Sequence, residues 1–149
     1  MNPFDSYPEG GRKLLGPVRG SNCRRVYCRE FMQQTGQKLC AYCGCDFTAC
    51  YPTWLTMVLD HVVPASVCAS MHIDLKWRRD YSNAVLACAA CNGFCNRYSI
   101  PAGTVPPATL EAFYDLRDRI FAERKKKIAE KREEERLFFS DKPWESKQG

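Results

Sequence analysis

The most regular hydrophobic pattern lies in the C-terminal part of the chain. From Thr109 onward, apolar residues recur mostly at steps of three and four, and no Gly or Pro interrupts them before Pro143. This spacing predicts a long helix over 109–139, with Thr109 as N-cap and Glu111 in the first turn. We expect its first half to dock on a core and its charged second half, ending with the run 123–136, to project into solvent. The apolar positions are Leu110, Phe113, Leu116, Ile120, Phe121 and Ile128.

Two shorter apolar runs predict strands. They are WLTMVLDHVV at 54–63 and NAVLA at 83–87, the second preceded by the turn-forming DYSN. Nearer the N-terminus, RRVYCREFMQQTG at 24–36 predicts a short helix that ends at Gly36. The mixture of helices and strands predicts the fold class α+β. The inward-facing residues of the short helix are expected to be Val26, Phe31 and Met32.

These patterns divide the 149-residue chain into five segments without an internal repeat. They are a basic N-terminal extension at 1–36, a core at 37–100, a linker rich in Pro and Gly at 101–108, the charged C-terminal helix at 109–139, and a tail at 140–149. The hydrophobic content of 45% is ordinary for a folded domain. The long polar ends predict a core smaller than the length alone suggests.

Positive charge is concentrated near the N-terminus. Residues 11–40 carry seven basic residues against one acid, Glu30, and the whole chain has a net charge of +5. An unscreened positive block of this kind suits phosphate groups. The Gly-rich first twenty residues are expected to form a loose arm, which is compatible with binding nucleic acid. For the run Lys125–Lys127 we expect a solvated helix face, with a DNA-tracking helix as the alternative.

The chain has no apolar segment of signal-peptide type and no run of membrane-spanning length. We therefore expect a cytoplasmic protein without a membrane partner. In that reducing compartment, ten cysteines favour metal binding or free thiols over disulfides. A secreted disulfide-rich protein is disfavoured on both grounds.

Four of the cysteines form two C-x2-C pairs separated by forty-four residues, namely Cys40 with Cys43 and Cys88 with Cys91. Each pair can offer two thiolates, and together they predict a closed, structural zinc site whose binding energy contributes to folding. The other cysteines leave more room for interpretation. Two C-x4-C spacings allow a second zinc site as an alternative. The last two cysteines are expected to be small buried residues. The spacings involve Cys23, Cys28, Cys45 and Cys50, and the two buried residues are Cys68 and Cys95.

A polar motif lies between the two pairs. LDHVVP places Asp60 and His61 at the end of an apolar run, and SNAVLACAACN contains Asn83 before the second strand and Asn92 directly after Cys91. Together with CAYC at 40–43, this order resembles the HNH endonuclease family, the ββα-metal nucleases with a zinc-stapled core. The resemblance covers about residues 38–97. Several separated elements in the right order make it specific.

The resemblance implies a ββα-metal core that hydrolyses DNA phosphodiester bonds by cutting or nicking. It assigns His61 as the general base for the attacking water and Asn83 as the residue that holds the backbone and orientation of His61. Asp60 and Asn92 would bind a catalytic Mg2+ or Mn2+, while the cysteines hold structural Zn2+. Such roles suit the chemistry, because imidazole accepts protons near neutral pH and oxygen ligands prefer hard cations. Since neighbours on a strand face opposite ways, the chain must bend around 62–64 for Asp60 and His61 to converge.

The sequence departs from the family pattern at two places. Asn92 stands where many members have His, which favours Mg2+ or Mn2+ over softer metals. The place three residues later, often basic, is Cys95. His72 has no counterpart and is expected on a loop or surface.

DNA is the expected partner of such a nuclease, with a homodimer if both strands are cut. Small stand-alone members are common in phages and bacteria, so the chain would act in a bacterial cytoplasm or, if phage-encoded, in the host cell. Trp77 would stack on a base or pack inside. The alternative function is a non-catalytic zinc module that binds nucleic acid, which leaves the Asp, His and Asn series unexplained. The residues expected to bind nucleic acid are Arg24, Arg25, Lys76, Arg78, Arg79 and Arg97.

Overall fold

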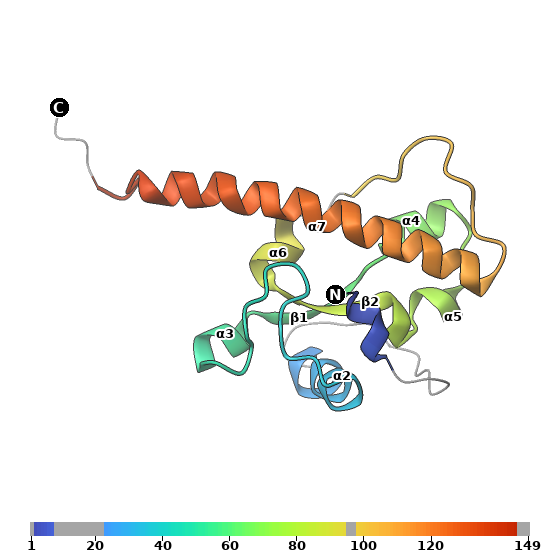
Figure 1. Cartoon of the computed structure of the whole chain (residues 1–149), viewed down its shortest axis with the longest axis horizontal. Helices are drawn as coiled ribbons and strands as arrows, with labels where there is room; N and C mark the ends of the chain where they lie inside the picture. Colours follow the sequence, from blue (N-terminus) through green and yellow to red (C-terminus); the bar gives the residue numbers. More distant parts are fainter. Residues whose placement is uncertain (1, 8–22, 95–97, 146–149) are drawn as a thin grey trace.

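A computed structural model of the chain describes residues 2–7, 23–94 and 98–145. At its centre is a two-stranded antiparallel sheet made of β1, Met57–His61, and β2, Ala84–Cys88. The register pairs Met57 with Cys88 and His61 with Ala84. Helices surround this small sheet, so the described part has the mixed helix and sheet content that the sequence predicts (Figure 1).

Short helices precede, connect and follow the two strands. In chain order they are η1 (Pro3–Ser6), η2 (Cys23–Cys28), α2 (Arg29–Thr35), α3 (Tyr51–Leu55), α4 (Ala65–Ser70), α5 (Leu75–Arg78), η3 (Tyr81–Asn83) and α6 (Ala89–Phe94). The π-helix η2 packs along β1, where the backbone N–H of Leu59 donates to the sulfur of Cys23 at 3.2 Å. This contact satisfies a polar group of β1 on the side away from β2.

The expected helix at 24–36 is present as η2 followed by α2. It ends at Gly36, whose φ of 70° is easily adopted by glycine. Phe31 is fully buried and Met32 is half-buried. The expected packing of Val26 is wrong, because Val26 is 43% exposed. Within the π-helical turn, Cys23 and Cys28 take the buried positions instead.

The strand expected at 54–63 is shorter in the structure. Its first residues belong to α3, where Pro52 lies in the first turn, a position that proline favours in helices. β1 therefore begins only at Met57. It ends at His61 because the chain bends over residues 62–63, and Pro64 then caps α4.

The longest helix, α7, spans Leu110–Ser140 and runs along one side of the molecule (Figure 1). The Thr109 hydroxyl caps it by accepting from the Ala112 N–H at 3.1 Å. Every residue of 129–140 is exposed, so the helix projects into solvent from residue 129 onward. The expectation that the whole run 123–136 projects is wrong for Arg124 and Ile128, which are buried. No described helix combines the length and the apolar character needed to cross a membrane. The buried residues of α7 are Phe113, Leu116, Arg117, Ile120, Phe121, Arg124 and Ile128.

The start of the chain packs on the core instead of forming a loose arm. Phe4 is buried, and its ring lies 5.6 Å from that of Phe121 on α7. The hydroxyl of Tyr7 donates to the backbone oxygen of Ala84 on β2. The prediction of a loose N-terminus is therefore wrong for residues 2–7, because aromatic burial stabilises this segment. Residues 8–22, the rest of the predicted arm, lie outside the described part.

Candidate metal centre and histidine site

The four paired cysteines form one cluster. Their sulfurs all lie within 4.8 Å of one another, and those of Cys43 and Cys88 are 3.9 Å apart. A tetrahedral zinc thiolate with bonds of about 2.3 Å has sulfur–sulfur edges of about 3.8 Å. The spacing of the cluster therefore fits a structural metal such as zinc, as the sequence predicts.

Local backbone structure delivers the sulfurs from two sides. Cys40 and Cys43 lie in a tight turn, where the Gly44 N–H donates to the Cys40 oxygen at 2.9 Å and Gly44 adopts a φ of 77°. Cys88 ends β2 and Cys91 lies in α6. The metal would thus tie the turn to the carboxyl end of β2 and to the helix that follows it.

The cluster also favours a cation electrostatically. A hydrogen bond with Cys88 lowers the pKa of the Cys40 thiol to about 4, while the same bond raises the pKa of Cys88. Burial raises the pKa of Cys91. Four thiolates would repel one another at this spacing, so a bound cation is needed to deprotonate the whole set.

The other cysteines do not assemble a second metal site within the described part of the chain. The sulfurs of Cys23 and Cys28 are 3.6 Å apart in the core, whereas Cys50 is exposed and hydrogen-bonded to Thr53. Cys45 lies beside the cluster, where it hydrogen-bonds with Cys43. Cys68 is buried as expected. Cys95 lies outside the described residues.

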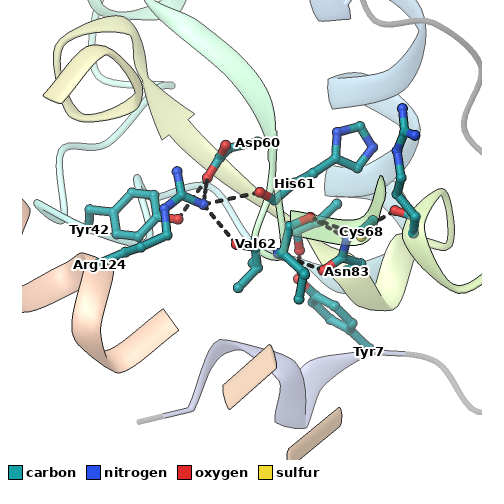
Figure 2. A network of polar contacts seen from close by, with 11 residues as sticks. Tyr7, Tyr42, Asp60, His61, Val62, Cys68, Asn83 and Arg124 are labelled. Carbon is teal, nitrogen blue, oxygen red and sulfur yellow. Dashed lines mark hydrogen bonds and ion pairs between the residues drawn. The ribbon is translucent and has the colours of Figure 1, made fainter. Parts of the chain in front are cut away.

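Asp60 is buried at a junction of three elements. Its Oδ2 atom accepts from the Tyr42 hydroxyl at 2.7 Å and lies 2.9 Å from a guanidinium nitrogen of Arg124 on α7. Its side chain is 9% exposed. Because the chain bends only after His61, Asp60 and His61 keep the opposite orientations of strand neighbours (Figure 2). The expected convergence of their side chains is therefore wrong for this structure.

His61 ends β1 and is half-buried. Its Nε2 atom is buried and has no hydrogen-bond partner among the described residues. Burial lowers the pKa of His61 below its ordinary value of 6.5; Asp60 acts in the opposite direction, and the charges of Arg78 and Arg79 lower it further. The imidazole is therefore neutral at neutral pH and can accept a proton.

Asn83 holds the bend that follows His61. Its side-chain oxygen accepts from the Val63 N–H at 2.9 Å, and its amide nitrogen donates to the backbone oxygens of Val63 and Arg78 at 3.2 and 3.0 Å. The Asn83 backbone oxygen accepts from the Val62 N–H at 2.8 Å. One fully buried residue therefore fixes the exit of β1 and ties it to the end of α5.

The remaining candidate residues lie around this centre. Asn92 is half-buried on α6, which packs against β1. The charges of Arg78 and Arg79 act on His61, and Lys76 is exposed on the same short helix. Arg24 and Arg25 lie on η2, which also packs against β1. Arg97 lies outside the described residues.

Two further residues from the sequence analysis have structural positions. His72 is exposed in the turn after α4, as expected. Trp77 packs, with its ring 5.7 Å from that of Phe113. Packing, rather than base stacking, is therefore the role that its contacts support.

The sequence analysis missed the residues that connect α7 to the centre. Arg124 donates to the backbone oxygens of His61 and Val62, both at 3.0 Å, and Arg132 donates to the sulfur of Cys91 at 3.7 Å. A signal was present, since Arg117 and Arg124 lie on the apolar face of the helix pattern, where a charge needs a partner. Nothing in the pattern identified that partner.

Comparison of the chain with protein-family models, curated proteins and solved structures finds no match.

Proposed function

We propose that the chain is a metal-dependent nuclease of the HNH type that hydrolyses DNA phosphodiester bonds, with His61 as general base. The observation that carries the proposal is the surroundings of the His61 ring. Its buried Nε2 atom has no hydrogen-bond partner among the described residues, although buried polar atoms are nearly always paired. A reacting water is the kind of partner that such a nitrogen suits.

The residues around His61 support its role. Because burial lowers its pKa, the ring is neutral at neutral pH, and with a proton on Nδ1 its Nε2 atom can take a proton from water. Asn83 fixes the backbone on one side of the bend, which limits motion of the base. Arg78 and Arg79 supply positive charge near the ring, which suits an approaching phosphate.

The oxygen donors of Asp60 and Asn92 suit a hard divalent cation in kind, and these residues would hold Mg2+ or Mn2+. Binding there would require the Asp60 carboxylate to leave Arg124 and turn toward the side of His61. When bound, the cation would stabilise negative charge on the phosphate and on the leaving oxygen. The cysteine cluster would carry zinc as a purely structural ion, because four thiolates leave no position for water. DNA is the proposed substrate and partner.

The test is cleavage of supercoiled plasmid by purified protein in Mg2+, with omission of Mg2+ as the metal control, because a chelator would also remove structural zinc. His61→Ala should reduce the rate about a hundred- to ten-thousand-fold, since that is the usual cost of losing a general base. His72→Ala is the matched control, because His72 is exposed and outside the site. It should cleave at the wild-type rate.

Circular dichroism, zinc content and DNA affinity without added Mg2+ should be the same for both variants and the wild type. Cleavage by His61→Ala at the wild-type rate would refute the catalytic role of this residue. Binding of plasmid without cleavage by the wild type in Mg2+ or Mn2+ would favour the alternative, a zinc module that only binds nucleic acid.

A further inference from the structure

Arg124 connects the helix α7 to Asp60 and His61, two residues of the proposed site. Its side chain is 3% exposed. One guanidinium nitrogen lies 2.9 Å from the Asp60 carboxylate and donates to the backbone oxygens of His61 and Val62, both at 3.0 Å (Figure 2). Arg124 therefore holds the carboxylate and the backbone of the bend at the same time.

The charge balance at Asp60 depends on this contact. A carboxylate buried to this extent is costly unless a positive charge compensates it. The Tyr42 hydroxyl donates a hydrogen bond to the same oxygen but carries no charge. In the described part of the chain, Arg124 is the basic residue within ion-pair distance of Asp60.

A divalent cation at Asp60 would meet the same carboxylate. The cation and the guanidinium both carry positive charge, so they cannot both lie close to one carboxylate without repulsion. The two backbone oxygens, in contrast, are acceptors that Arg124 can keep when the carboxylate turns to the cation. The contacts of Arg124 thus divide into one that competes with a cation and two that do not.

We propose that Arg124 is a built-in competitor of the divalent cation at Asp60 and also a positioning residue for His61. It neutralises Asp60 in the cation-free protein, and it anchors the His61–Val62 backbone with or without the cation. This inference rests on the proposed function, because it places the catalytic cation at Asp60.

The two roles predict opposite effects of one substitution. Arg124→Met should bind Mn2+ about tenfold more tightly or better, because it leaves a buried carboxylate without its compensating charge. The same variant should cleave plasmid more slowly at saturating Mn2+, because the backbone of His61 loses its anchor. Arg124→Lys keeps the charge and should restore Mn2+ affinity to near the wild-type value.

Mn2+ binding is measured directly from the electron paramagnetic resonance signal of the free ion, so this readout does not depend on activity. Asp60→Asn should lose the binding. Arg117→Met is the matched control, since Arg117 is also a buried arginine of α7 but donates to the Ser82 oxygen and pairs with Asp118. It should bind Mn2+ like the wild type.

Thermal unfolding gives a second readout, which can be interpreted even if Arg124→Met is destabilised. The free variant should unfold at a lower temperature than the wild type, and Mn2+ should raise its unfolding temperature more than that of the wild type. Adding Asp60→Asn to Arg124→Met removes both charges and should abolish this extra response to Mn2+.

Mn2+ affinity of Arg124→Met equal to or below that of the wild type would overturn the inference, as would unchanged Mn2+ binding by Asp60→Asn. The inference and the proposed function can fail separately. Tighter Mn2+ binding by Arg124→Met in a protein that never cleaves DNA would uphold competition at Asp60 and refute the nuclease. If the wild type cleaves DNA and substitution of Arg124 leaves Mn2+ affinity unchanged, the nuclease is upheld and the competition at Asp60 is refuted.

Discussion

At the scale of single residues, two asparagines have different surroundings. Asn83 is fully buried, and its amide group contacts three backbone groups at the exit of β1 and the end of α5. Asn92 is half-buried on α6, directly after Cys91 of the cysteine cluster. Both belong to the proposed site, but Asn83 acts by holding the backbone, whereas Asn92 would act on a cation.

Substituting each by alanine should separate these roles. Asn83→Ala leaves buried backbone groups without partners at about 1–3 kcal/mol each, so we expect the free energy of unfolding to fall by about 3 kcal/mol. Asn92→Ala should change it by less than about 0.5 kcal/mol, as surface substitutions usually do, yet abolish cleavage. Urea unfolding in zinc-containing buffer measures the first effect and plasmid cleavage the second. Equal stability losses in the two variants would contradict this division.

At the scale of elements, a metal bound at the cysteine cluster would join the cysteine turn to the end of β2. Replacing Cys43 or Cys88 by Ser should remove the zinc and unfold the core, because binding energy at such a site is folding energy. Elemental analysis should find about one zinc per chain in the wild type and none in these variants. Cys50→Ser is the control, since Cys50 is exposed and outside the cluster. Well-folded wild-type protein without zinc would disprove the structural role of the ion.

The long helix α7 divides into a docked part and a projecting part at about Ala129. Truncation after Ala129 removes only exposed residues of the helix and the hydrogen bond of Arg132 with Cys91, so the unfolding temperature should drop by a few degrees at most. Truncation after Ala122 also removes Arg124 and the buried Ile128, whose loss alone should cost about 2–5 kcal/mol. Thermal unfolding distinguishes the two. Similar losses would mean that the projecting half supports the core.

At the scale of the whole molecule, exposed basic residues of η2 and α5 should govern affinity for DNA. Neutralising Arg25 and Lys76, both exposed, should weaken binding and reduce the slope of log affinity against log salt by about 0.9 for each phosphate that the protein no longer neutralises. Arg136→Gln is the control, because Arg136 lies on the projecting half of α7 and pairs with Glu133. Fluorescence anisotropy over a salt series measures the slope. An unchanged slope in the double variant would place the DNA elsewhere.

Features that depend on short spacings along the chain could be predicted from the amino-acid sequence. The C-x2-C pairs predicted the cysteine cluster, and the three- and four-residue steps predicted α7 with Thr109 as its cap. Such signals survive because a turn or a helix is specified by neighbours in the chain. The predicted ends of β1 were less accurate, since the first residues of the expected strand belong to α3.

Contacts between residues far apart in the chain could not be predicted and are known from the folded structure. Arg124 and His61 are 63 positions apart, and Phe4 reaches Phe121 from the opposite end of the chain. The charge pattern placed Arg124 in the run expected to project into solvent, whereas the structure buries it. Its burial and its partner both depend on how the helix packs against the sheet. That packing is set by the summed burial of many side chains, a property that no short motif contains. The ion pair of Asp60 with Arg124, and the competition it implies, therefore became visible only in the folded chain.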